Sequence, residues 1–169
     1  MKYLYTRVKE NDEVLIPDDL QVKIFTPTIG GGLLLAGERR CFKDMAVRAL
    51  FQLLTCGKAR IYYLRQNDKL VHTSYVIPKC YKFSYLGKED YQIGPCYTYL
   101  EYRGKGYYPL MLRHICKSEG SEKTVFYMTV DENNIASIKG IEKAGLIRRG
   151  SIRVTKLTKR YVLENKKKG

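Results

Sequence analysis

The chain has 169 residues, 44% hydrophobic and 28% charged, which is ordinary for a globular domain and excludes a disordered or fibrous protein. No stretch reaches the ~20 apolar residues of a membrane span, and the start becomes charged too early for a secretory signal. The net charge of +14, from 31 Lys and Arg against 17 Asp and Glu, favours anionic partners. We therefore expect one cytoplasmic domain over residues 1–169, with no membrane association.

The five cysteines are widely spaced, form no C-x-x-C pair, and have only His72 and His114 as possible histidine partners. An odd number in this spacing is typical neither of a disulfide framework nor of a structural zinc site. We expect no metal.

In the first half of the chain, segments rich in β-branched and aromatic residues predict strands at 2–8, 21–27, 60–66 and 70–77. Apolar residues from Phe42 to Leu54 recur at helical spacing, and Gly57 is placed to end that helix. The last two strands should form an antiparallel hairpin, because only Asn67-Asp68-Lys69 separates them as a three-residue loop.

In the second half, strands are predicted at 91–99, 124–130, 147–156 and 160–164. Gly94-Pro95 should interrupt the first of these, as a bulge or a splayed edge would. Pro109 suits the first turn of a helix that ends near Gly120, and a second helix is predicted over 134–144, closed by Gly145. The order of elements predicts an α/β or α+β domain with a mixed sheet rather than a doubly wound one.

The segment Glu101–Pro109 reads EYRGKGYYP and joins a predicted strand to a predicted helix. Gly104 and Gly106 would let the backbone approach an anion at the helix N-terminus, while Arg103 and Lys105 add positive charge. The same residue types are common in surface turns, and the segment is neither a dinucleotide fingerprint nor a P-loop. On this stretch alone, a phosphate cradle and a surface turn both remain open.

A second segment, YMTVDENNIASIKGIEKAGL at 127–146, combines a strand, Asn134, Ser137 and a helix that ends in Lys-x-Gly. The RGKGYY segment resembles the pyrophosphate loop of the GNAT superfamily of acetyl-CoA-dependent N-acetyltransferases. The segment at 127–146 resembles a later block of the same superfamily. Tyr108 departs from the family pattern, which usually has a small residue at that position. The resemblance implies a GNAT-like fold, with a central, mostly antiparallel, splayed sheet flanked by helices, and acetyl-CoA as cosubstrate.

In this family the strand before the loop separates from its neighbour and pairs with the pantetheine arm. The resemblance thus implies that Cys96 and Thr98 donate backbone N–H groups to the cofactor, with Tyr97 on the opposite face. The residues implied to surround the pyrophosphate are Arg103, Gly104, Lys105, Gly106, Tyr107 and Tyr108. Asn134 and Ser137 would lie along the cofactor arm, although Asn134 also suits a helix cap and Cys96 a small buried hydrophobe.

Catalytic residues are harder to carry over. The family's usual general acid, a Tyr seven residues after the motif Asn, is Ile141 here, and a base found in some relatives falls on Gln92, which cannot serve. The polar candidates nearby include Asp90, Tyr127 and His72. Asp90 is the preferred base, because strand alternation puts it on the same face as Gln92. Alternatively, Asp90 is a solvent-exposed carboxylate in a turn, and His72 is a half-buried histidine with a structural role.

The implied acceptor is a small primary amine. The basic excess and nine tyrosines between Tyr75 and Tyr108 suit an anionic, aromatic acceptor such as a nucleotide-linked amino sugar, although tyrosines also simply favour strands. Peptide amines and polyamines remain open, as does the choice between monomer and homodimer. The alternative function is a non-catalytic nucleic-acid-binding domain that uses residues 148–168, where nine basic residues accompany one acid and one aromatic, Tyr161.

Overall fold

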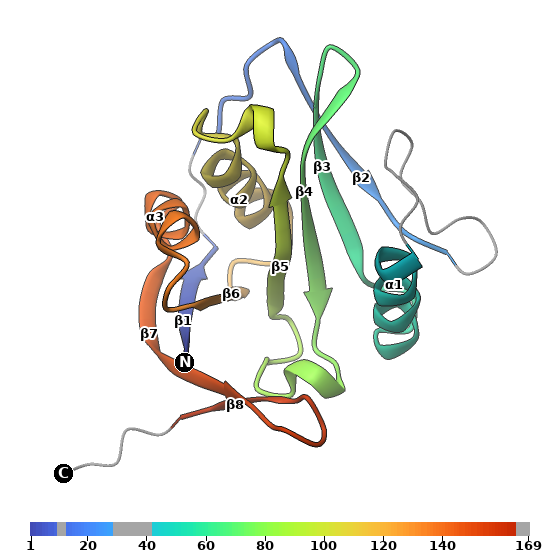
Figure 1. Ribbon diagram of the computed structural model, residues 1–169, viewed down its shortest axis with the longest axis vertical. Helices are drawn as coiled ribbons and strands as arrows, with labels where there is room; N and C mark the ends of the chain where they lie inside the picture. Colours follow the sequence, from blue (N-terminus) through green and yellow to red (C-terminus); the bar gives the residue numbers. More distant parts are fainter. Residues whose placement is uncertain (10–12, 29–41, 165–169) are drawn as a thin grey trace.

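The computed structural model describes residues 1–9, 13–28 and 42–164. In these ranges, eight strands form one sheet in the order β2-β3-β4-β5-β6-β1-β7-β8 (Figure 1). The strands are β1 (Lys2–Val8), β2 (Leu20–Phe25), β3 (Arg60–Gln66), β4 (Lys69–Pro78), β5 (Tyr91–Thr98), β6 (Val125–Asp131), β7 (Ile147–Val154) and β8 (Tyr161–Leu163). Neighbours run antiparallel except β5 and β6, so the predicted mixed, mostly antiparallel sheet is confirmed.

The α-helices of the described ranges, α1 (Phe42–Leu54), α2 (Tyr107–Ser118) and α3 (Ile135–Lys143), cover both faces of the sheet, and two short 3-10 helices, η1 (Tyr81–Phe83) and η2 (Leu100–Tyr102), lie in its connections. Because side chains alternate along a strand, β3 sends Ile61 into a cluster with Phe51 of α1 and Tyr62 into a cluster with Leu112 of α2. The helix over 42–54 therefore has the predicted bounds, and each face of the sheet has its own core. None of these helices is both long and apolar enough to cross a membrane.

The hairpin between β3 and β4 differs by one residue from the prediction. Asn67 and Asp68 both have positive φ, at 46° and 60°, and Lys69 already belongs to β4. Two positive-φ residues form the tight turn whose twist matches that of its strands, and Asn and Asp tolerate this conformation better than most side chains. The loop therefore has two residues rather than three.

The first strand lies in the second half of the sheet. β1 runs antiparallel to both β6 and β7, with Lys2 opposite Asp131 and Val8 opposite Val125. Its side chains also hold the end of α3: Tyr5 donates from its hydroxyl to Glu142 Oε1 at 2.9 Å, and buried Arg7 donates to the carbonyl of Ala144. The first strand thus shares one core with the end of α3.

The sheet opens between β5 and β6. These two strands pair only at Tyr91 with Phe126 and at Gln92 with Tyr127. Beyond that point β5 follows β4 through a bulge, where Gly94 and Pro95 face the single residue Tyr75 between two paired positions. Gly94 has a φ of 121°, which side-chain-bearing residues rarely adopt, so this glycine permits the bulge. The interruption predicted at Gly94-Pro95 is confirmed, and it borders the candidate site.

Candidate functional site

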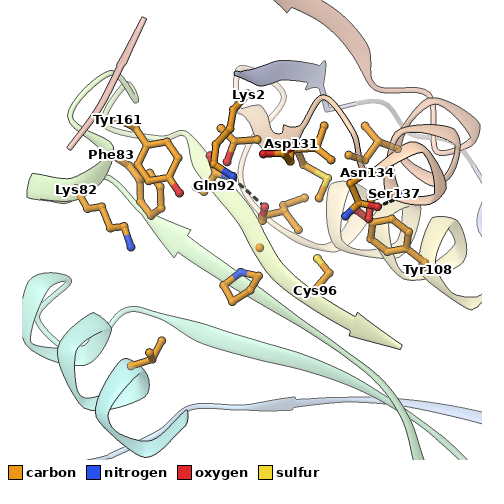
Figure 2. A pocket seen from close by; sticks show the side chains of 18 of the residues that line it. Lys2, Lys82, Phe83, Gln92, Cys96, Tyr108, Asp131, Asn134, Ser137 and Tyr161 are labelled. Atoms are coloured by element: carbon orange, nitrogen blue, oxygen red, sulfur yellow. Dashed lines mark hydrogen bonds between the residues drawn. The ribbon is translucent and has the colours of Figure 1, made fainter. Parts of the chain in front are cut away.

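Two cavities meet where the sheet opens. The first, about 640 Å³, lies among β5, the loop before α2, and α3, and we call it the loop cavity. The second, about 490 Å³, is lined by the rings of Phe51, Phe83 and Tyr161 among others, and we call it the aromatic cavity. Four residues line both cavities: Cys96, Tyr108, Asn134 and Ser137. We call these four residues the junction of the two cavities; Figure 2 shows them together at one end of the aromatic cavity.

The loop before α2 leaves backbone N–H groups at the start of that helix without a cap. Gly104 and Gly106 have φ of 78° and 81°, and Gly106 is the N-cap of α2 without any side-chain cap. The first-turn N–H groups of Tyr107 and Tyr108 are therefore left uncapped, while Pro109 has no N–H to satisfy. An uncapped helix N-terminus with accessible glycine backbone favours a bound phosphate.

Positive side chains surround this helix start. Arg103 lines the loop cavity and is held by a 3.1 Å hydrogen bond from Nε to the carbonyl of Thr98. Lys139 and Lys143 also line it, from one face of α3. Lys143 was noted from the sequence only as part of the Lys-x-Gly ending, and Lys139 was not noted, although their i, i+4 spacing indicates that they share one face of the helix. Lys105, which was predicted at the pyrophosphate, lies outside the cavity lining, with Nζ 5.3 Å from the ring centre of Tyr102.

The free edge of β5 faces the opening. Tyr99 N donates to Val71 O of β4 at 3.0 Å, so by alternation Tyr97 also turns its backbone groups toward β4. The N–H groups of Cys96 and Thr98 then point the other way, to the side where β6 has separated. This direction agrees with the prediction that Cys96 and Thr98 donate backbone N–H groups to a ligand.

A chain of hydrogen bonds runs beneath the junction. His72 Nδ1 lies 2.7 Å from Thr98 Oγ1, His72 Nε2 lies 2.8 Å from Ser74 Oγ, and Ser74 Oγ donates to Cys96 Sγ at 3.1 Å. Complete burial lowers the pKa of His72 from 6.5 to about 3, and burial raises the pKa of Cys96 to about 12. At neutral pH this chain therefore contains a neutral imidazole and a protonated thiol.

Tyr108 separates the two cavities, and Gly140 makes its position possible. A Cβ added at Gly140 would lie 2.5 Å from Tyr108 Cδ1, so only glycine leaves room for the ring. On its other side, the ring centre of Tyr108 lies 5.7 Å from that of His72. Burial raises the pKa of Tyr108, which keeps the phenol protonated at neutral pH. The structure thus explains how a large side chain fits where a small one was expected.

Asn134 and Ser137 have the local role considered from the sequence and also lie at the junction. Asn134 Oδ1 accepts a hydrogen bond from Ser137 N at 3.1 Å and so caps α3. Ile141, at the usual position of the general acid, is buried and lines the aromatic cavity. Side chains from α3 thus contribute to both cavities.

Two of the three catalytic candidates lie away from the cavities, and the third lies beneath them. Asp90 is held by backbone N–H groups, with Oδ2 accepting from Gly87 at 2.7 Å and Oδ1 from Val125 at 3.0 Å. Tyr127 packs edge-on against Tyr85, with ring centres 5.6 Å apart, and burial raises its pKa. Neither residue lines the loop cavity or the aromatic cavity, whereas His72 lines the loop cavity. Gln92 lines the aromatic cavity and accepts a 2.6 Å hydrogen bond from the hydroxyl of Tyr85.

The far end of the aromatic cavity contains residues that the sequence did not single out. Lys82 and Phe83 lie beside Tyr161 there, across the cavity from Cys96 and Tyr108 (Figure 2). The Tyr161 ring centre lies 5.1 Å from that of Phe83, so this ring is engaged in packing. Tyr161 is the single aromatic of residues 148–168 and its ring lines this cavity, so that segment has no row of rings on which successive bases could stack, and the nucleic-acid-binding alternative is not favoured.

No protein-family profile and no curated protein matches the sequence. Solved structures do match: a GNAT-family acetyltransferase from Colwellia psychrerythraea (16% identity, TM-score 0.57, 87% of this chain and 52% of that one) and a tandem GNAT protein from the clavulanic acid biosynthesis pathway (14%, 0.53, 87% and 50%). A GCN5-related N-acetyltransferase from Kribbella flavida is 9% identical, with a TM-score of 0.50 over 86% of this chain and 53% of that one. The chain spans about half the length of these structures. The likeness shows that the chain has the GNAT fold.

Proposed function

We propose that the protein transfers an acetyl group from acetyl-CoA to the primary amine of a small acceptor. The observation that carries this proposal is the meeting of two cavities at Cys96 and Tyr108, one ending at a cationic, uncapped helix N-terminus and the other walled by aromatic rings. A reaction between an anionic cosubstrate and a second molecule needs such a pair of sites with a shared end. The GNAT fold of the chain supports the same assignment.

The loop cavity would hold acetyl-CoA. Its pyrophosphate suits the N–H groups of Tyr107 and Tyr108 beside Arg103, and its pantetheine arm suits the free N–H groups of Cys96 and Thr98. Lys139 and Lys143 add positive charge from α3. When bound, acetyl-CoA supplies an acetyl group already activated as a thioester.

The groups at the junction that would take part in the reaction are uncharged. An amine attacks only as the free base, and desolvation of the amine as the two substrates fill the junction would favour that form, because desolvation disfavours the ammonium. The Tyr108 phenol stays protonated and lines both cavities, so we assign it the hydrogen bond to the departing sulfur. Asp90, the base predicted from the sequence, lies outside both cavities, and no proton is routed through it here.

The acceptor would occupy the aromatic cavity, whose volume of about 490 Å³ is within the range of small-molecule sites. The nucleotide-linked amino sugar expected from the sequence stays a prediction within this class.

Two measurements test the proposal. Calorimetric titration should show acetyl-CoA binding, and a panel of small amines should include acceptors that release the coenzyme A thiol in proportion to acetylated product. Absence of acetyl-CoA binding at high micromolar concentration would contradict the assignment of the loop cavity. Binding with thiol release that no amine accelerates would contradict amine acetylation.

A further inference from the structure

We infer that the acceptor carries an anionic group, a carboxylate or a phosphate, and that Lys82 binds this group at the far end of the aromatic cavity. The inference rests on the proposed function for the placement of the amine at the junction. The binding of the anion itself follows from the aromatic cavity alone.

Lys82 lies among three aromatic rings that come from separate parts of the chain. Its Nζ is 5.3 Å from the ring centre of Phe51 in α1, 5.9 Å from that of Phe83, and 5.8 Å from that of Tyr161 in β8. Phe51 and Phe83 are nearly parallel, with an interplanar angle of 10°. The ammonium is thus directed to one place by side chains that also reduce its contact with water.

Within the described residues, no carboxylate forms an ion pair with Lys82. Asp131 is the one carboxylate among the described residues that line the aromatic cavity. It stands opposite Lys2 in the pairing of β1 with β6, and its Oδ1 accepts from Asn133 N at 3.1 Å. Lys2 also lines this cavity, so among the described lining residues its positive charge balances the negative charge of Asp131, and the charge of Lys82 is left for a ligand.

The position of Lys82 selects between classes of acceptor. A partly desolvated ammonium binds a carboxylate or phosphate through a charge-assisted hydrogen bond, while the rings of Phe51, Phe83 and Tyr161 offer an apolar surface to the body of the ligand. Figure 2 shows Lys82 at the end of the cavity away from Cys96 and Tyr108. The acceptor class is therefore a compact molecule with an amine at one end and an anion at the other, which disfavours polyamines.

The test compares matched ligands that differ only in the distal group. The carboxylate probe is 4-(aminomethyl)benzoate, its neutral counterpart is 4-(aminomethyl)benzamide, and (4-(aminomethyl)phenyl)phosphonate is the phosphate-like arm. Binding to the full chain is measured by calorimetry, so that the result does not depend on turnover. Because a hydrogen bond between two charged groups is stronger than one to a neutral amide, at least one anionic probe should bind about tenfold or more tightly than the amide.

Three variants test whether Lys82 causes the preference for anionic probes. Lys82→Met keeps most of the aliphatic volume and should reduce the preference to within about twofold, whereas Lys82→Arg should retain it. Lys79→Met is the matched control, because Lys79 is exposed in the same connection and lines neither cavity. The better of the two anionic probes distinguishes a carboxylate from a phosphate acceptor.

Equal binding of acid, phosphonate and amide to the wild type, or binding of none of them at millimolar concentration, overturns the inference. So does a preference that survives Lys82→Met. Failure of the proposed function looks different: the protein would bind the anionic probe selectively through Lys82 but would not bind acetyl-CoA or release coenzyme A.

Discussion

The contact between Tyr108 and Gly140 gives a quantitative prediction. Gly140→Ala places a Cβ 2.5 Å from Tyr108 Cδ1 and 2.8 Å from Cε1, closer than carbon atoms pack, so the ring has to move. Overpacking of this kind costs about 1–3 kcal/mol, while Ala in a helix gains about 1 kcal/mol over Gly. The net loss in free energy of unfolding should be about 0–2 kcal/mol.

The sign should reverse when the ring is absent. In a Tyr108→Ala background the overpacking disappears, and Gly140→Ala should stabilise the protein by about 1 kcal/mol through helix propensity alone. Urea unfolding of the wild type, both single variants and the double variant measures the coupling energy, which should be about 1–3 kcal/mol. Gly150→Ala is the control, because its added Cβ meets nothing within 4 Å. Coupling below about 0.5 kcal/mol would refute this packing, since sites that do not interact are additive within that range.

Three further predictions concern single residues. The pKa of His72 is lowered from 6.5 to about 3, so its contribution to stability is complete above pH 6.5 and is lost as the pH falls toward 3. Between pH 7.5 and 5, the wild type should lose about 2 kcal/mol more than His72→Gln in urea unfolding, and equal losses would count against the buried neutral imidazole. Gly106→Val forces a β-branched residue to a φ of 81° and should weaken acetyl-CoA binding about tenfold or more by calorimetry, whereas unchanged affinity would mean that the loop is only a surface turn. Tyr108→Phe keeps the ring and should lower kcat about tenfold to a hundredfold with an unchanged Tm, and an unaltered kcat would remove the phenol from the reaction.

Structural features that depend on residues close together in the chain could be predicted from the sequence. The spacing of its apolar residues predicts the helix from Phe42 to Leu54. Asn134 caps α3, as expected of a short polar side chain directly before a helix. Gly104 and Gly106 adopt positive φ, a conformation that glycine takes without steric cost. Each of these features is decided within a few residues, where backbone preference and periodicity act directly.

Features that depend on tertiary contacts could not be predicted in this way. The strand pattern of residues 2–8 was visible, but its place between β6 and β7 depends on contacts such as that of Tyr5 with Glu142. Tyr108 was recognised as unusual, yet the glycine that accommodates it lies on a different helix. The cluster of Phe51, Lys82 and Tyr161 likewise brings together residues from distant segments, and no local pattern marks them as neighbours.

The crystal structure of the complex with coenzyme A tests the central claim most directly. We predict that the pyrophosphate contacts the N–H groups of Tyr107 and Tyr108 beside Arg103, that the pantetheine arm runs along the free edge of β5 at Cys96 and Thr98, and that the thiol ends at Tyr108. Coenzyme A bound outside the opening between β5 and β6, or absent from crystals grown at saturating concentration, would contradict the account.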